Sequence, residues 1–157
     1  YNSIKIRIVR YLMSPVEEAL RLGVHVVNIA TISLDGTHPS NRFTYYALPE
    51  TLTNFFYITT FRQSTKVKEI ENNPHVSFTT APSNEKNAWV GSNDAIAEIL
   101  ETPIQTVVPL FKDQIDGWYD TVGDLDNNDW VVIKITFNSA MIVSQDGVSY
   151  FPETEDD

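Results

Sequence analysis

A group of hydroxyl and basic side chains stands where a predicted strand passes into a predicted helix. Either Ser64 or Thr65 occupies the N-cap position, and the basic residues around them are Arg62, Lys66 and Lys68. The N-terminal end of a helix already carries about half a positive charge, so cations there are unfavourable unless an anion lies among them. Free amides, hydroxyls and ammonium groups together form a phosphate site. A solvated basic first turn is the commoner arrangement, and the residues alone leave both interpretations open.

The segments on either side of this group have the patterns of a strand and of a short helix. Residues 55–60 are aromatic or β-branched, which is typical of a strand. Val67 and Ile70 then follow helical spacing, and the helix is expected to end at Asn72-Asn73-Pro74, because Pro cannot continue it. A strand therefore leads directly into a helix whose first turn holds the polar group.

Strand patterns at hairpin spacing occupy much of the remaining chain. They cover residues 24–34, 40–48, 75–80, 89–100, 130–137 and 140–144. Asp35-Gly36 is a strong signal for a hairpin turn. A bulge or bend is expected at residues 91–94 of the long strand, because Gly weakens a strand interior. Residues 3–12 alternate loosely and fit either a strand or a helix entrance.

Helices are expected near both ends of the chain. Ser14-Pro15 predicts an N-cap and a first helical position, and this helix should end at Gly23 with Val16, Ala19 and Leu20 inward. A further helical region is expected at 103–120. Its buried side would contain Val107, Leu110, Phe111, Ile115 and Trp118. Residues 120–129 and the tail at 153–157 are acidic. Together these patterns predict a single domain over residues 1–157, with a mainly β (α+β) antiparallel barrel and a few short helices.

The composition limits the class of partner. With 11 basic and 21 acidic residues the formal net charge is −10, which argues against a nucleic-acid partner. There is no cysteine, so disulfides and thiolate chemistry are excluded. No apolar run approaches the ~20 residues that span a membrane, and the first residues lack a signal-peptide pattern. We therefore expect a cytoplasmic protein without a membrane partner.

Other familiar chemistry finds little support in the residues. The three histidines, His25, His38 and His75, are isolated from one another, so no metal site is predicted. Motifs of nucleophilic hydrolases, P-loops and dinucleotide-binding folds are missing, and no catalytic residue can be named. The aromatic residues suit a hydrophobic core one by one, and as a group they also suit a planar heteroaromatic ligand. They are Phe43, Tyr45, Tyr57, Trp89, Trp118 and Trp130.

Residues 26–100 resemble the FMN-binding split-barrel proteins related to pyridoxamine 5′-phosphate oxidase. The densest match is Tyr57-x-Thr59-Thr60, followed by Ser64-Thr65-Lys66-Val67 and then Asn73-Pro74-x-Val76-Ser77. These segments stand in the family's order relative to the Asp35-Gly36 hairpin. The resemblance implies an antiparallel split β-barrel that binds FMN.

The resemblance also implies roles for particular residues. Ser64 and Lys66 would bind the FMN phosphate, supported by Thr59 and Thr60, with Arg42 reaching in from the neighbouring strand. The remaining implied contacts are the backbone of Phe43 and Thr44 at the isoalloxazine edge and Tyr57 near the ribityl chain. A phosphate would supply the anion that the basic helix start lacks. The family forms homodimers with flavin at the interface, so Trp89 or Trp118 of the partner subunit is expected to cover the ring.

The sequence departs from the oxidase itself in two places. Ala47 stands near the position of a substrate-binding lysine, and the end of the chain lacks the Arg and His that contact substrate. Oxidase activity on pyridoxamine phosphate is therefore not implied. The main hypothesis is an FMN-dependent oxidoreductase acting on a small-molecule substrate or NAD(P)H. The alternatives are a non-enzymatic flavin-binding or stress-associated protein, and the same fold binding deazaflavin or haem.

Overall fold

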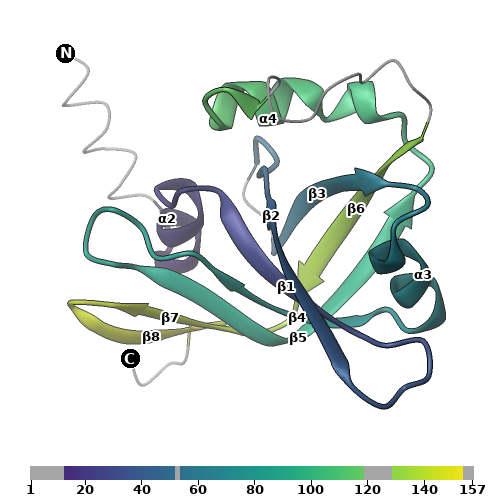
Figure 1. Cartoon of the computed structure of the whole chain (residues 1–157). Helices are drawn as coiled ribbons and strands as arrows, with labels where there is room; N and C mark the ends of the chain where they lie inside the picture. Colours follow the sequence, from purple (N-terminus) through teal and green to yellow (C-terminus); the bar gives the residue numbers. More distant parts are fainter. Residues whose placement is uncertain (1–12, 52–53, 119–128, 154–157) are drawn as a thin grey trace.

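The computed structural model describes residues 13–51, 54–118 and 129–153, and strands form most of it (Figure 1). The elements in chain order are α2 (Pro15–Arg21), β1 (Val26–Ile32), β2 (Pro39–Tyr45), β3 (Phe55–Phe61), α3 (Thr65–Asn72), β4 (His75–Thr80), β5 (Trp89–Leu100), η1 (Ile104–Thr106), α4 (Val108–Gln114), β6 (Trp130–Phe137), β7 (Ala140–Ser144) and β8 (Gly147–Phe151). The mainly β, antiparallel fold predicted from the sequence is confirmed. The expectations for residues 3–12, for most of the acidic loop at 120–129 and for nearly all of the tail lie outside the described residues.

The strands form one antiparallel sheet in the order β2-β1-β4-β5-β6-β3, with β7 paired to β5 and β8 paired to β7. The predicted strands are all present, and β1 is central, as its two apolar faces indicate. The last predicted strand ends at residue 144, and strand β8 was not predicted from the sequence. This short strand begins at Gly147 and is soon followed by Pro152, so it offers too few residues for an alternating pattern.

The sheet curls until β2 and β3, the two ends of this order, approach one another (Figure 1). The chain just after β2 reaches β3 through a single bridge. Its two hydrogen bonds run from Ala47 N to Tyr57 O at 3.0 Å and from Tyr57 N to Ala47 O at 2.9 Å. In the described part of the chain no strand ladder joins β2 to β3. The barrel is therefore split along a seam between these two edge strands.

The bend predicted at residues 91–94 is a change of register in β5. Val76 of β4 faces Ala95, whereas Phe78 faces Ser92, so three steps along β5 match two along β4. Such a bulge bends the strand and increases its twist. As a result, residues 89–91 pair with β7, and residues 95–100 pair with β6.

Local sequence signals also account for the turn and the first described helix. Gly36 has φ +74°, the left-handed conformation that the hairpin turn between β1 and β2 requires. Ser14 caps α2 by accepting a hydrogen bond from Glu17 N at 3.3 Å, and Pro15 is the first helical residue. Val16, Ala19 and Leu20 are buried, as predicted.

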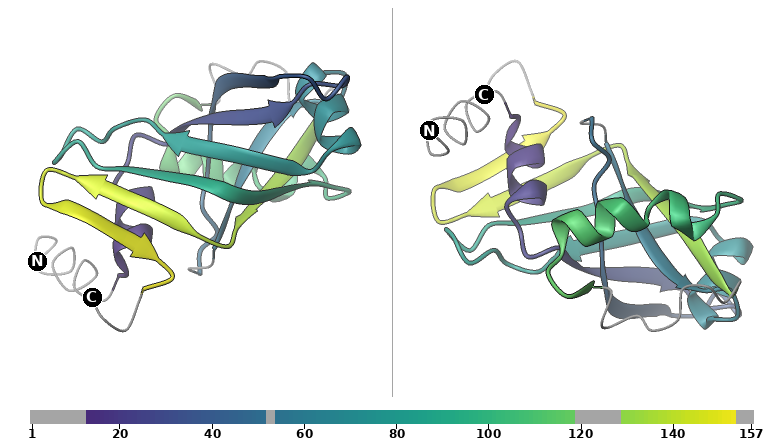
Figure 2. Two further views of the ribbon diagram at one scale, coloured as in Figure 1. Left: turned by 90° about the horizontal axis from the view of Figure 1, so that it is seen from below. Right: turned by 90° about the horizontal axis from the view of Figure 1, so that it is seen from above.

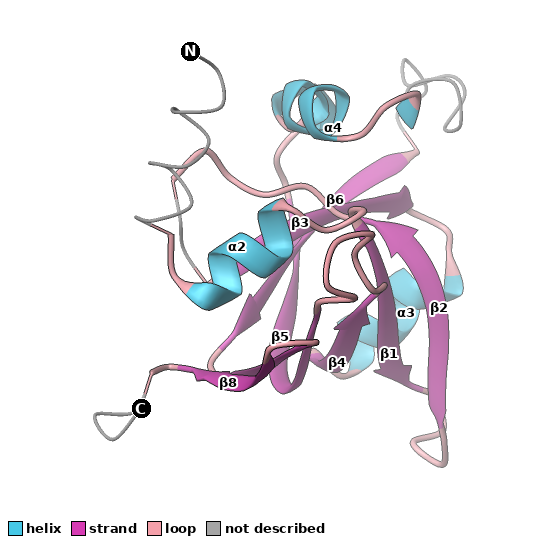
Figure 3. Ribbon diagram, turned by 90° about the vertical axis from the view of Figure 1, so that its left-hand side faces the viewer, coloured by secondary structure: helices cyan, strands magenta, loops and turns pink. Residues whose placement is uncertain are grey.

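Apolar side chains gather on both sides of the curled sheet. The large core fills the inside, where Phe56, Ile58 and Ile133 are fully buried. Helices α2 and α3 contribute to this core from opposite ends of the barrel (Figures 1 and 2). A second cluster, which includes Phe111 and Trp118, lies between α4 and the outer face of the sheet. Figure 3 shows α4 and β8 on opposite sides of the molecule.

Within the three described ranges, no helix combines the length and the apolar character that crossing a membrane requires.

Candidate functional site

A cavity of about 280 Å³ opens in the seam between β2 and β3. Its lining consists of Phe43, Thr44 and Tyr45 from β2, Thr59, Thr60 and Phe61 from β3, and Lys66, Trp118 and Trp130. Five of the eight residues that the sequence analysis assigned to cofactor binding line it: Phe43, Thr44, Thr59, Thr60 and Lys66. The fold thus brings most of the predicted site to the place where the sheet is open.

Lys66 is the buried cation of this seam cavity. It is the second residue of α3, and only 8% of its surface is exposed. Within the described part of the chain, its ammonium group has no hydrogen-bond acceptor and no carboxylate partner. Burial, together with a smaller effect of the nearby charge of Arg42, lowers the pKa of Lys66 to about 8. A buried cation without a counter-ion is costly, so this group is suited to receive an anion.

Ser64 connects the cavity wall to the start of α3. Its Oγ accepts a hydrogen bond from the backbone N–H of Val67 at 3.4 Å and another from the hydroxyl of Thr60 at 3.3 Å. The first turn of α3 contains no acidic residue. Ser64 itself is not among the lining residues, but it places the helix N-terminus and the Thr60 hydroxyl side by side next to Lys66.

Arg42, which the sequence analysis assigned to the phosphate, has protein partners in this structure. Its Nη2 donates to Glu69 Oε1 at 3.0 Å, and its Nη1 donates to Thr31 Oγ1 at 2.7 Å and to Ser40 O at 3.2 Å. Arg42 does not line the seam cavity, although its charge is close enough to lower the pKa of Lys66. The pairing with Glu69 was not anticipated, because on α3 that residue looks like part of a solvated face.

Aromatic side chains form the walls and the mouth of the cavity. The rings of Phe61 and Trp130 lie 4.3 Å apart between centroids, and Trp118 packs on Phe111 at 4.9 Å. At the mouth, Phe43 is 67% exposed and Phe61 is 52% exposed. Planar rings of this kind suit a planar heteroaromatic ligand.

Two other expected residues lie in or near the seam cavity. Trp118 lines the cavity of its own chain, and its expected contact with the ring of a partner subunit stays a prediction. Tyr57 lies at the bridge that closes one end of the seam and packs edge-on against Phe55, outside the residues that line the cavity. Trp130, predicted only as one of the aromatic residues that suit a planar ligand, lines the cavity because the register between β6 and β3 places it beside Phe61.

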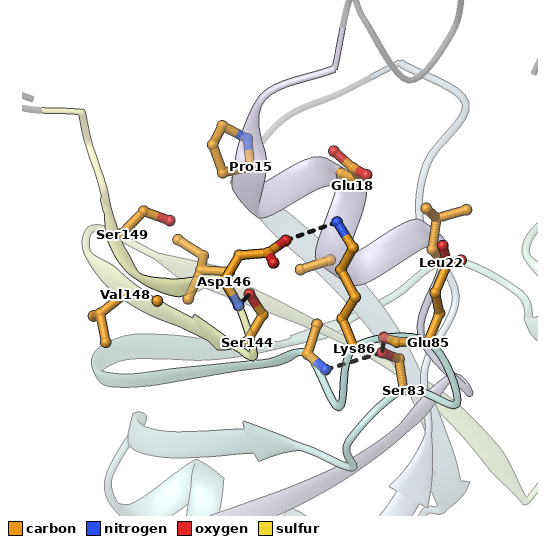
Figure 4. Close-up of a pocket in the computed structure, with 14 residues that line it drawn as sticks. Pro15, Glu18, Leu22, Ser83, Glu85, Lys86, Ser144, Asp146, Val148 and Ser149 are labelled. Atoms are coloured by element: carbon orange, nitrogen blue, oxygen red, sulfur yellow. Dashed lines mark hydrogen bonds and ion pairs between the residues drawn. The ribbon is translucent and has the colours of Figure 1, made fainter. Parts of the chain in front are cut away.

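A second cavity, of about 300 Å³, lies between α2 and the turn that joins β7 to β8 (Figure 4). Lys86 and Asp146 face one another across it at 2.7 Å, and both side chains are more than half exposed. These two charges neutralise each other, and water screens such a pair. The second cavity therefore lacks the buried, unpaired charge that distinguishes the seam cavity.

The chain is similar to known proteins in its three-dimensional structure. No protein-family model and no curated protein matches the sequence. A pyridoxamine 5′-phosphate oxidase-related, FMN-binding protein from Nostoc punctiforme is 13% identical, with a TM-score of 0.58 over 88% of this chain and 90% of that chain. An F420 reductase is 21% identical, with a TM-score of 0.63 over 78% of this chain and 94% of that chain. A heme-binding protein from Mycobacterium smegmatis is 20% identical, with a TM-score of 0.65 over 88% of this chain and 57% of that chain.

At these identities the similarity establishes the fold. It is the pyridoxamine 5′-phosphate oxidase-like FMN-binding split barrel, as the sequence motifs indicated. Proteins with this fold include ones named for FMN, for F420 and for haem, so the fold leaves the ligand to be argued from the cavity itself.

Proposed function

On the premise of this fold, we propose that the chain binds FMN in the seam cavity and acts as an FMN-dependent oxidoreductase. The observation that carries the proposal is Lys66, a buried ammonium group at the start of α3 that has no counter-ion among the described residues. In the proposal the FMN phosphate lies against Lys66, the hydroxyls of Ser64 and Thr60, and the free amides of the first helical turn. Charge-assisted hydrogen bonds of this kind are the strongest that a protein offers to a phosphate.

The cavity favours FMN over the other ligands found with this fold. The isoalloxazine ring would lie among the aromatic side chains, with backbone groups of Phe43 and Thr44 along its edge. The described lining contains no histidine, so haem would have no imidazole ligand there. A deazaflavin with several negative charges is disfavoured by a chain whose net charge is −10.

Bound FMN supplies hydride or electron transfer, and the residues of this chain bind and orient it. Tyr45 and Lys66 are the titratable residues among those that line the cavity. A carboxylate or imidazole that could move a proton is missing from the described lining. This observation favours, as a second candidate, a flavin-binding protein without a proton-transfer step of its own.

We further propose that the protein is a homodimer with the flavin near the interface. Phe43 and Phe61 are largely exposed at the mouth of the seam, although both are large apolar residues. A second subunit would cover them together with the open face of the ring. Burial of such apolar surface is a main driving force of stable association.

The test measures FMN binding by the purified protein and by the Lys66→Ala/Ser64→Ala variant. We expect the variant to lose more than about tenfold in FMN affinity, because a hydrogen bond to a charged group contributes roughly 1.5–3 kcal/mol. Riboflavin, which lacks the phosphate, should bind both proteins equally. Lys68→Ala is the matched control, since Lys68 is exposed on the same helix. An unchanged FMN affinity in the double variant would refute the assignment of the phosphate site.

Catalysis is tested separately from binding. The FMN-loaded protein is mixed with NADH or NADPH and an electron acceptor, and flavin reduction is followed by the loss of its visible absorbance. Turnover supports the oxidoreductase. Stable FMN binding without reduction by either nucleotide supports the non-enzymatic flavin-binding protein.

A further inference from the structure

A buried ion pair lies next to the proposed phosphate site. Arg42 of β2 and Glu69 of α3 are joined at 3.0 Å, and Thr31 of β1 links them by accepting from Arg42 and donating to Glu69 Oε1 at 3.2 Å. The Glu69 side chain is only 2% exposed, and that of Arg42 is 25% exposed. The pair therefore ties three elements of the fold together underneath the seam.

The charges of this cluster do not balance. Arg42 and Lys66 are both close to the cavity, and the charge of Arg42 acts on Lys66. Glu69 neutralises Arg42, so the three side chains together present one net positive charge. Removing one partner of a buried ion pair leaves the other as an uncompensated charge, which is strongly unfavourable. Arg42 is thus expected to stay with Glu69 when an anion enters the cavity.

We propose that Glu69 is a specificity-determining residue that limits the anion affinity of the seam cavity. By neutralising Arg42, it leaves Lys66 as the single cation that the described lining presents to the ligand. A site with one net positive charge suits a terminal phosphate monoester, and it gives little advantage to a pyrophosphate or another polyanion. This inference rests on the proposed function, because it assigns the class of phosphate that the FMN site accepts.

The central experiment uses Glu69→Gln, which keeps the shape of the side chain and removes its charge. FMN affinity should rise about tenfold, because an unneutralised Arg42 would then attract the phosphate across a partly buried medium. Riboflavin affinity should not change. Competition with inorganic phosphate and pyrophosphate should show a larger gain for pyrophosphate, since the effect scales with ligand charge. A structural role of Glu69 alone would not produce this dependence on charge.

A second variant identifies the source of the gain. Adding Arg42→Met to Glu69→Gln should abolish it, because the unneutralised charge is then removed. A gain that survives in the double variant would overturn the inference, and so would an unchanged or weaker FMN affinity in Glu69→Gln.

The wild-type protein provides a measurement that does not depend on the folding of a variant. In wild type, phosphate and pyrophosphate should displace FMN with similar affinities, within about threefold, because the second phosphate group of pyrophosphate meets no further cation that would offset its desolvation. A tenfold preference for pyrophosphate would contradict the inference. If wild type binds no flavin at all, the proposed function itself fails, and that result is distinct from FMN binding without the expected selectivity.

Discussion

Helices α2 and α3 both pack against the same core, but the side chains in their first turns carry opposite charges. Each begins at a serine cap, Ser14 in one case and Ser64 in the other, and each buries apolar side chains in the same core. The first turn of α2 contains Glu17 and Glu18, which match the positive end of the helix dipole. The first turn of α3 has no acid and contains the buried Lys66. The first turn of α2 therefore offsets the helix dipole, whereas the first turn of α3 adds a buried positive charge to it.

The largest effects test whether both helices are equally part of the core. Leu20→Ala in α2 and Ile70→Ala in α3 should each lower the free energy of unfolding by about 2–5 kcal/mol, since both side chains are almost fully buried. Denaturant unfolding measures this loss. Leu34→Ala is the control, because Leu34 is 54% exposed and should change stability little. If only one of the two variants lost this much unfolding free energy, the two helices would not contribute equally to the core.

A smaller effect is expected from removing the charge that makes the two helix starts differ. Lys66→Met should raise the free energy of unfolding of the ligand-free protein by roughly 2–3 kcal/mol at pH 7, because it removes a buried cation that has no partner among the described residues. Thermal or denaturant unfolding measures the gain. Lys68→Met, at an exposed position on the same helix, should have little effect.

The same substitution should change how stability depends on pH. The pKa of Lys66 is about 8 in the folded protein and 10.5 when unperturbed. Between these values the unfolded chain binds more protons, so the contribution of Lys66 to stability rises with pH across this window. That rise should be missing in Lys66→Met. Parallel pH profiles for wild type and variant would show that Lys66 is not an unpaired cation in the folded state.

The smallest effects come from the two caps. Ser14→Ala and Ser64→Ala should each cost about 1 kcal/mol of stability, the usual value for losing a serine cap. Only Ser64→Ala should also weaken FMN binding. Equal FMN affinities in the two variants would mean that the start of α3 is a cap and nothing more.

Sequence patterns predicted the fold well because its strands are either alternating or continuously apolar. The Ser14-Pro15 helix start, the hairpin turn at Gly36 and the bulge in β5 were each anticipated from local chemistry. Strand β8 was missed, because five residues starting at a glycine carry almost no periodic signal. Curling of the sheet and the seam follow from strand pairing, which is not a local property.

In the candidate site, too, features that depend on neighbouring residues were predicted, and features that depend on distant residues were not. Lys66 could be singled out because its charge conflicts with the helix dipole, a conflict visible within a few residues of sequence. Arg42 and Glu69 are 27 positions apart, and the residues next to each of them give no indication that the two side chains pair. The contribution of Trp130 likewise depends on facing Phe61 in the β3–β6 ladder. A charge that opposes its own helix dipole can therefore be recognised from the sequence. An ion pair between residues far apart in the chain cannot.

The seam has a consequence for solubility. Strand β3 forms one of its edges, and its seven residues, FFYITTF, contain no charge, no proline and no glycine. Segments of this composition are prone to amyloid-like stacking when they lie on an open sheet edge. Arg62 follows the strand directly and is exposed, as expected of a residue that discourages such pairing. A ligand lodged in the seam would cover this edge and so protect the folded protein from self-association.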